Sequence, residues 1–217
     1  MATEDVEDRS PPVDPESSES AEDSTATAKP ASKHLKARIL GEWTIIIVLA
    51  LAAAFLIRTY CFQTFYIPST SMVPTLQVGD RIVVSKLSVR FGTIHRGDIL
   101  VFERPPAEDC GGPQVNDLVK RVIGLPNEYL MSEGSLQYYS KTASPYHWHR
   151  IYETWSHTEP LGNPIPLGTH VPPNSYYMMG DNHYYSCDSR IWGPIPRSLV
   201  VGKVVFRIWP LSRVGFL

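Results

Sequence analysis

The sequence predicts a mainly β domain that follows one N-terminal transmembrane helix. From about residue 62 onward, short runs of β-branched and aromatic residues alternate with Gly, Pro, Asn and Asp, a pattern typical of many short strands. Sustained helical periodicity is absent outside one apolar segment, Trp43 to Ile57, which contains fifteen residues and no charge. Residues 131–175 are rich in Tyr, His, Ser and Pro with weak periodicity, so they are predicted to form an elaborated loop or a hairpin insertion. We therefore expect three parts: a disordered acidic tail over 1–38, a membrane anchor over 39–61 and an all-β domain over 62–217.

The tail carries much of the chain's acidic charge. Residues 1–29 hold nine Asp and Glu residues against Arg9 and Lys29, and such a polar composition buries too little apolar surface to fold. Because the whole chain has a net charge of -2, the part beyond the tail carries about +5. No run of Lys and Arg with interleaved aromatic residues occurs there, so a nucleic-acid partner is not indicated.

Three interpretations compete for the apolar segment: a cleaved secretory signal, a buried core helix and a retained signal anchor. As a helix, fifteen residues extend about 22 Å, so Trp43 and Tyr60 would mark the interfaces of a bilayer core of about 30 Å. The long polar region before the segment, and the lack of a small-x-small site at residues 58–61, favour the anchor. Three basic residues precede it and predict a cytoplasmic tail and an extracytoplasmic β domain, in a single-pass protein of the cell membrane: Lys33, Lys36 and Arg38.

A turn rich in hydroxyl groups follows the anchor. Pro68 and Pro74 interrupt hydrogen-bond ladders, so residues 69–75 are predicted to form an exposed turn between two β runs. Two interpretations stay open for its hydroxyl side chains: they bond to their own backbone, or one of them does chemistry. The three side chains are Ser69, Thr70 and Ser71.

A lysine stands out in the β run Leu118 to Val122. Side chains alternate between the two faces of a strand, so Lys120 or its neighbour Arg121 must share a face with apolar residues. Lys120 would either extend to the edge of the strand or be buried. Burial would lower the pKa of its amine toward neutrality and make it a usable general base.

The segment Gly180 to Arg190 is polar and acidic, although β runs flank it. It is either a solvated loop or the support of a site, with an Asp188–Arg190 ion pair and a free Ser186 hydroxyl.

Cysteine and histidine residues are sparse. Cys61 lies at the edge of the anchor, which leaves Cys110 and Cys187 as the candidates for a disulfide; three unpaired thiols are the alternative. The one histidine cluster, His147 to His149 together with His157, is interpreted as loop surface, and no metal site is expected.

Taken in order, these segments resemble the type I signal peptidases, which are membrane-anchored Ser/Lys proteases. The resemblance covers roughly residues 43–211 and rests on four ordered motifs after the anchor. They are Pro68 to Leu76 with Gly79-Asp80, Arg96 to Phe102, Lys120 to Pro126, and Gly180 to Asn182 with Ser186 to Arg190.

The resemblance implies a β-rich catalytic domain that removes signal peptides from exported preproteins after small-x-small sites, without a cofactor or metal. Ser71 resembles the nucleophile and Lys120 the general base, while the Ser69 hydroxyl and the Ser71 amide would stabilise the oxyanion. Ser186 would hold the lysine amine, and the residues that would support its loop are Asp181, Asp188 and Arg190. Four apolar residues would contact the substrate: Phe65, Ile67, Met72 and Val119. The expected partners are signal peptides and membrane lipid.

Two segments depart from the family pattern, which usually has Arg-Asp-Asn at residues 183–185 and Gly-Asp at residues 127–128. This chain has His183-Tyr184-Tyr185 and Asn127-Glu128 instead. His183 suggests a Ser/His/Asp triad, but the chain contains no Gly-x-Ser-x-Gly elbow. Two other functions stay open: a cytosolic Ser/Lys autoprotease of the repressor-cleaving type, and a membrane-tethered β domain that binds a partner without catalysis.

Overall fold

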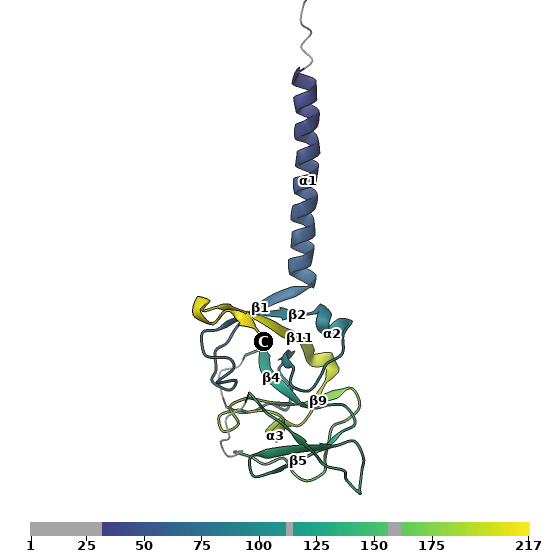
Figure 1. Cartoon of the computed structure of the whole chain (residues 1–217), viewed down its shortest axis with the longest axis vertical. Coiled ribbons are helices and arrows are strands. Elements are labelled where there is room, and N and C mark those ends of the chain that lie inside the picture. The colour runs from purple at the N-terminus through teal and green to yellow at the C-terminus, as the bar shows by residue number, and fades with distance from the viewer. Residues whose placement is uncertain (1–31, 112–114, 156–161) are drawn as a thin grey trace, which may run out of the picture. The chain divides into compact units, whose positions relative to one another are not determined.

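The computed structural model describes residues 32–111, 115–155 and 162–217 (Figure 1). The chain divides into two compact units, Met1–Ile47 and Val48–Leu217. Most of the predicted tail lies outside the described residues. Helix α1 begins at Ser32, before residue 39 where the anchor was predicted to start, because no proline lies between Ser32 and the apolar run and the single Gly41 does not interrupt the helix.

Helix α1 (Ser32–Tyr60) contains the predicted apolar segment. Its large apolar side chains are exposed, including those of Trp43, Leu49 and Phe55. Within the described ranges, no helix combines the length and the apolar character needed to cross a membrane. The helix is therefore present, and its role as an anchor stays a prediction.

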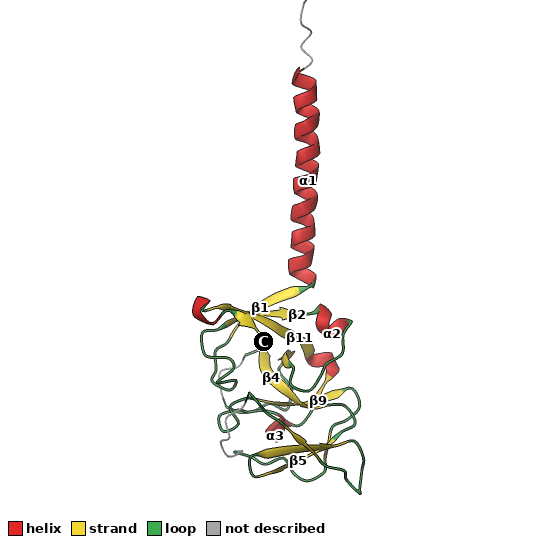
Figure 2. Cartoon of the chain, viewed as in Figure 1, coloured by secondary structure: helices red, strands yellow, loops and turns green. Residues whose placement is uncertain are grey.

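The mainly β prediction is confirmed by two antiparallel sheets in the second unit (Figure 2). The larger sheet has eight strands in the order β1-β2-β11-β3-β4-β9-β10, and β12 pairs with β11. Its strands are β1 (Phe62–Tyr66), β2 (Arg81–Ser85), β3 (Ile99–Glu103), β4 (Asp117–Gly124), β9 (Ser175–Met179), β10 (Ile195–Pro196), β11 (Val200–Trp209) and β12 (Gly215–Phe216).

A second sheet of four strands occupies the region where sequence predicts an elaborated loop or a hairpin insertion, residues 131–175. Its order is β7-β6-β5-β8, and β5 and β6 form a hairpin that turns at Gly134, where φ is +59°. The strands are β5 (Tyr129–Glu133), β6 (Leu136–Ser140), β7 (His149–Ile151) and β8 (Thr169–His170). Within the second unit, β4 runs from the end that holds β1 and β2 toward the second sheet, and β9 pairs with its far half (Figure 1).

Short helices complete the unit. They are α2 (Leu87–Arg90), α3 (Ser189–Trp192), η1 (Arg197–Leu199) and η2 (Leu211–Arg213).

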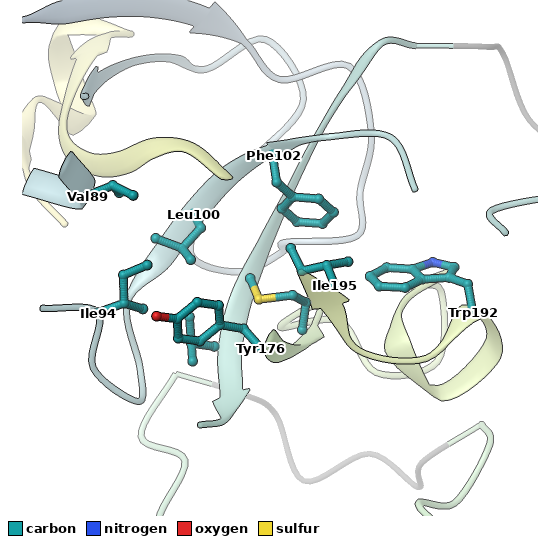
Figure 3. Close-up of a cluster of buried hydrophobic side chains, with 9 residues drawn as sticks. Val89, Ile94, Leu100, Phe102, Tyr176, Trp192 and Ile195 are labelled. Carbon is teal, nitrogen blue, oxygen red and sulfur yellow. The ribbon is translucent and has the colours of Figure 1, made fainter. Parts of the chain in front are cut away.

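Three clusters of buried apolar side chains hold these elements together. The first joins β3, β9 and α3, and the rings of Phe102 and Trp192 lie 6.0 Å apart within it (Figure 3). The second packs Met72 and Leu76, from the turn after β1, against strands of the larger sheet. The third packs the second sheet against β4 and β9 through residues such as Leu130 and Tyr177. Full burial of each large apolar side chain contributes roughly 1.5–3 kcal/mol, so the turn after β1 is anchored firmly.

Candidate active site

The turn between β1 and β2 is only partly exposed. Ser69 and Thr70 are exposed as predicted, but Ser71 and Met72 are only 7% and 1% exposed, so the prediction of an exposed turn over residues 69–75 is wrong at these two residues. The reason is packing: Met72 and Leu76 are buried in the apolar cluster below the turn and draw Ser71 inward. A backbone hydrogen bond of 2.8 Å from the Leu76 amide to the Met72 carbonyl fixes this part of the turn.

Strand β4 carries Lys120 to the buried side of this turn. Its Nζ donates a hydrogen bond of 2.7 Å to Ser71 Oγ, and the lysine is 4% exposed. Burial lowers the pKa of Lys120 to about 8, although the carboxylates of Asp188, Asp181 and Glu108 act in the opposite direction. The structure thus contains the buried lysine and not the lysine that extends to the strand edge.

Arg121, the next residue of β4, is also buried, and the sequence reasoning gave it no role. Its Nε and Nη2 donate to the two carboxylate oxygens of Asp181 over 2.7 and 2.6 Å, and its Nη1 donates to the Gly97 carbonyl over 2.7 Å. The guanidinium also lies over the ring of Trp155, 4.5 Å from its centroid. The sequence contained a signal for this role. Lys120 and Arg121 are adjacent in a strand, so each face of the strand carries one cation, and a buried cation needs an anionic partner.

The loop after β9 contains the predicted ion pair. Arg190 Nε and Nη2 each donate to an Asp188 carboxylate oxygen over 2.8 Å. Asp188 also caps α3 by accepting from the Arg190 amide, and it accepts from the Gly180 amide over 3.1 Å. These bonds fold the loop upon itself.

The same loop is attached to the turn that carries Ser71. The Asn182 amide donates to the Ser71 carbonyl over 3.1 Å, and Asn182 Nδ2 donates to the Thr70 carbonyl over 3.3 Å. Gly180 makes the close approach possible, because a Cβ there would lie 2.4 Å from the Ser71 carbonyl oxygen and 2.3 Å from Ser186 Oγ. Sequence reasoning placed Gly180 in a motif without giving it this function.

Two further serines were predicted to assist Ser71 and Lys120, and their hydroxyl groups have different contacts. Ser186 Oγ packs against Gly180, is buried, and has no hydrogen-bond partner among the described residues, so the bond to the lysine amine that the resemblance implies is not formed here. Ser69 Oγ lies 3.3 Å from Ser71 Oγ.

A cleft of about 300 Å³ opens beside Ser71 and Lys120. All four residues predicted to contact substrate line it, namely Phe65, Ile67, Met72 and Val119. Glu108 and Tyr185, which sequence reasoning did not select, line it as well. The cleft is therefore mostly apolar near the serine and carries charged groups toward Glu108.

Cys110 and Cys187 form a disulfide that lines this cleft, which decides between the two alternatives left by the sequence. With Glu108 they make the one group of three metal-ligand residue types found among the described residues, but their sulfurs are bonded to each other and offer no thiolate. His147 and His149 are exposed, and His157 lies outside the described residues.

His183 is buried, and its imidazole contacts Gln137 of β6 and Glu153, which follows β7. Its Nε2 lies 3.3 Å from Glu153 Oε2 and 3.4 Å from Gln137 Nε2. Burial lowers the pKa of His183 to about 4. The nitrogen at hydrogen-bond distance from Ser71 Oγ is Lys120 Nζ.

Comparison with known proteins shows what this chain is similar to. The family described as "Signal peptidase, peptidase S26" matches residues 40–209. A signal peptidase I of Leptolyngbya laminosa is 36% identical over 211 residues, which cover 92% of this chain and 95% of that protein. A signal peptidase I of Bacillus caldolyticus is 35% identical (74% of this chain, 86% of that protein), and a signal peptidase IB of Staphylococcus aureus is 32% identical (81% and 92%).

A solved structure of a signal peptidase I from Enterococcus faecalis also matches. It has 23% identity and a TM-score of 0.38, and the match covers 51% of this chain and 96% of that chain.

Proposed function

Because the chain belongs to the signal peptidase family S26, we propose that Ser71 and Lys120 are the nucleophile and general base with which it cleaves signal peptides from preproteins. The chain is a signal peptidase I and therefore a serine endopeptidase. The observation that carries the assignment of the two residues is the buried hydrogen bond of 2.7 Å from Lys120 Nζ to Ser71 Oγ.

The chemistry follows from the protonation state of the lysine. With its pKa lowered to about 8 by burial, a useful fraction of Lys120 is neutral near pH 7 to 8 and accepts the Ser71 proton as the oxygen attacks the scissile carbonyl. The protonated amine then donates to the leaving amine, which leaves an ester on Ser71. A water molecule, deprotonated by the same amine, hydrolyses that ester and restores the enzyme.

The oxyanion formed during the attack needs hydrogen-bond donors. We assign this role to the Ser69 hydroxyl and the Ser71 backbone amide, and the 3.3 Å separation of the two serine hydroxyls supports it. Removal of one such donor costs on the order of a hundredfold to a thousandfold in rate.

The supporting roles belong to the loop after β9. Asp188 and Arg190 hold the loop in shape, and Asp181 fixes it to β4 through Arg121. Ser186 is buried beside Gly180, in the same loop. We propose that it turns its hydroxyl to the lysine amine when substrate occupies the cleft.

The substrate is proposed to bind as an additional strand. Strand β1 is an edge strand of the larger sheet, and β9 pairs with β4 only from Arg121 onward, which leaves the edge at Leu118 and Val119 open in the described structure. The apolar side chains of Phe65, Ile67, Met72 and Val119 frame shallow space beside the serine. Small residues at the first and third positions before the cut fit such space.

We also propose that α1 anchors the enzyme in the cell membrane with residues 1–38 on the cytoplasmic side. The exposed apolar side chains of α1 support this, as do the basic residues Lys33, Lys36 and Arg38 before them. Membrane lipid is then the second partner, and the short connection from Tyr60 to Ser71 keeps the nucleophile near the bilayer, where signal peptides emerge.

The test is to incubate the full chain in detergent with a preprotein and to determine the new N-terminus by mass spectrometry. Cleavage after a small-x-small site is expected, and Leu or Phe at the first or third position before the cut should abolish it. Binding without cleavage would favour a non-catalytic tether, and cleavage of the chain itself alone would favour the autoprotease.

A further inference from the structure

A cluster of two buried polar side chains and one half-buried carboxyl group connects the second sheet and the segment after β7 to the loop that follows β9. Glu153 follows β7, Gln137 belongs to β6, and both meet His183 of the loop, at 3.3 Å from Glu153 Oε2 and 3.4 Å from Gln137 Nε2. Gln137 is 1% exposed and His183 is 4% exposed. Buried polar groups in such a cluster are costly to separate, so they hold the two elements together.

The cluster is mainly neutral over a wide pH range. Burial raises the pKa of Glu153 to about 7 and lowers that of His183 to about 4, so between these values both groups are neutral and the carboxyl O–H donates a hydrogen bond to the imidazole Nε2. Two ion pairs face the cluster: Arg121 with Asp181, and Arg190 with Asp188. Asp181 disfavours a charge on Glu153, and the two arginines partly offset this.

The contacts of His183 and its neighbours lead directly to the proposed catalytic residues. The His183 carbonyl accepts a 2.7 Å hydrogen bond from Arg190, which is paired with Asp188. The charge of Asp188 has a larger effect on Lys120 than that of any other group acting on it, and the adjacent Asn182 amide donates to the Ser71 carbonyl. A displacement of His183 would thus disturb the surroundings of both reacting side chains.

We propose that Glu153, acting through His183, is a positioning residue that holds the loop of residues 180–190 against Ser71 and Lys120. This inference rests on the proposed function. Strand β6 and the segment after β7 then supply the amide and carboxyl groups that hold His183 of the loop. The Asp188–Arg190 ion pair stabilises the loop from within.

The test compares kcat and KM for preprotein cleavage between pH 6 and 9 in the full chain. Glu153→Ala should lower kcat by about tenfold or more and leave KM within about twofold, because the change lies away from the cleft. Burial is the largest cause of the low lysine pKa, so a loosened loop that admits water should also move the midpoint of the pH profile above about 8. Glu153→Gln keeps a hydrogen-bond donor and should restore most of kcat.

A double-mutant cycle tests whether Glu153 acts through His183. If Glu153 acts through His183, Glu153→Ala combined with His183→Ala should be no slower than the slower single variant. Additive losses would contradict the route through His183. Glu133→Ala, which removes an exposed carboxylate of β5, is the matched control and should behave as wild type.

The inference is overturned if Glu153→Ala cleaves with the kcat and pH midpoint of the wild type. Should that variant fail to fold, the shorter Glu153→Asp takes its place under the same criterion. A wild-type chain that cleaves nothing counts instead against the proposed function.

Discussion

Lys120 has an unusual environment for a lysine, because it is buried on β4 with its amine on the Ser71 hydroxyl. Its desolvation is only partly offset by the carboxylates around it, and this balance brings the pKa to about 8. A general base works best when its pKa lies near the working pH. The burial of one side chain therefore links the fold to the rate of the reaction.

The pH profile of the wild type follows from this. We expect kcat/KM to rise with pH through a midpoint near 8 and then to level, since only the neutral amine accepts the serine proton. Lys120→Arg should lower the rate by about two to four orders of magnitude, because a guanidinium keeps its proton. A midpoint well below 8 that disappears in His183→Ala would show instead that histidine is the base.

Glu153 gives a separate prediction for stability. Its pKa is raised from 4.5 to about 7, so between these values the unfolded chain loses the proton while the folded chain keeps it, and the free energy of unfolding falls as pH rises. The glutamine of Glu153→Gln does not ionise, so this variant lacks that fall in the free energy of unfolding with pH. Its stability relative to wild type should therefore increase by on the order of 3 kcal/mol between pH 4 and 8 in urea unfolding. His183, whose shift has the opposite sign, is present in both proteins; a difference that is constant with pH would contradict the assignment.

The sequence identifies some of these residues and not others for a physical reason. Ser71 and Lys120 belong to local motifs, so their types and spacing are visible along the chain. The roles of Arg121 and Glu153 depend on Asp181 and His183, which lie far away in the sequence and meet them only after folding. The burial of Ser71 was mispredicted because it depends on where Met72 and Leu76 pack.

At the scale of elements, the site is the meeting point of one turn, one strand and one loop. The turn after β1 supplies Ser71, β4 supplies Lys120, and the loop after β9 is bonded to the turn through Asn182. The loop approaches the turn this closely only because Gly180 has no side chain.

Gly180→Ala should accordingly reduce activity strongly. The added Cβ would meet the Ser71 carbonyl oxygen and Ser186 Oγ at 2.4 and 2.3 Å, so either the turn or the loop must shift, and a shift of about 1 Å costs on the order of a hundredfold in kcat. Gly215→Ala, where a Cβ meets nothing within 4 Å, is the matched control and should retain wild-type turnover. Equal activity of the two variants would mean that the close approach does not matter.

Elements were predicted unevenly from the sequence. The strands around the motifs were expected, because β-branched runs bounded by Gly and Pro mark them. The second sheet was expected only as an elaborated loop or a hairpin, because residues 131–175 are rich in Tyr, His, Ser and Pro and show weak alternation. Its stability comes from packing on β4 and β9, which local periodicity does not reveal.

At the scale of the molecule, the disulfide Cys110–Cys187 closes a long segment of chain, with a sequence separation of 77. Cys187→Ser should lower the free energy of unfolding by on the order of 4 kcal/mol, because the unfolded chain regains the freedom that the crosslink removes. Cys61→Ser, which removes the free cysteine among those described, is the control and should change stability little. Denaturant unfolding of the full chain under oxidising conditions measures both, and equal midpoints would contradict a structural role for the disulfide.

The whole molecule was largely predictable in outline. One apolar segment, one β-rich region and four ordered motifs in the sequence led to the signal peptidase family, and the family comparison confirms that assignment. The membrane topology follows from the basic residues before α1 and stays a prediction. The sequence named Cys110 and Cys187 as the candidate pair but left open whether they bond, because the number and spacing of cysteines do not determine whether a disulfide forms.

The central claim is that one serine and one lysine, brought together from two elements, cleave the preprotein. The most direct measurement is the turnover of one preprotein by Ser71→Ala and Lys120→Ala in the detergent-solubilised full chain, beside the exposed controls Ser144→Ala and Lys141→Ala. We predict that both site variants lose activity by about three orders of magnitude or more while they keep the wild-type unfolding transition, and that both controls cleave at the wild-type rate. Turnover near wild type in either site variant would contradict the claim.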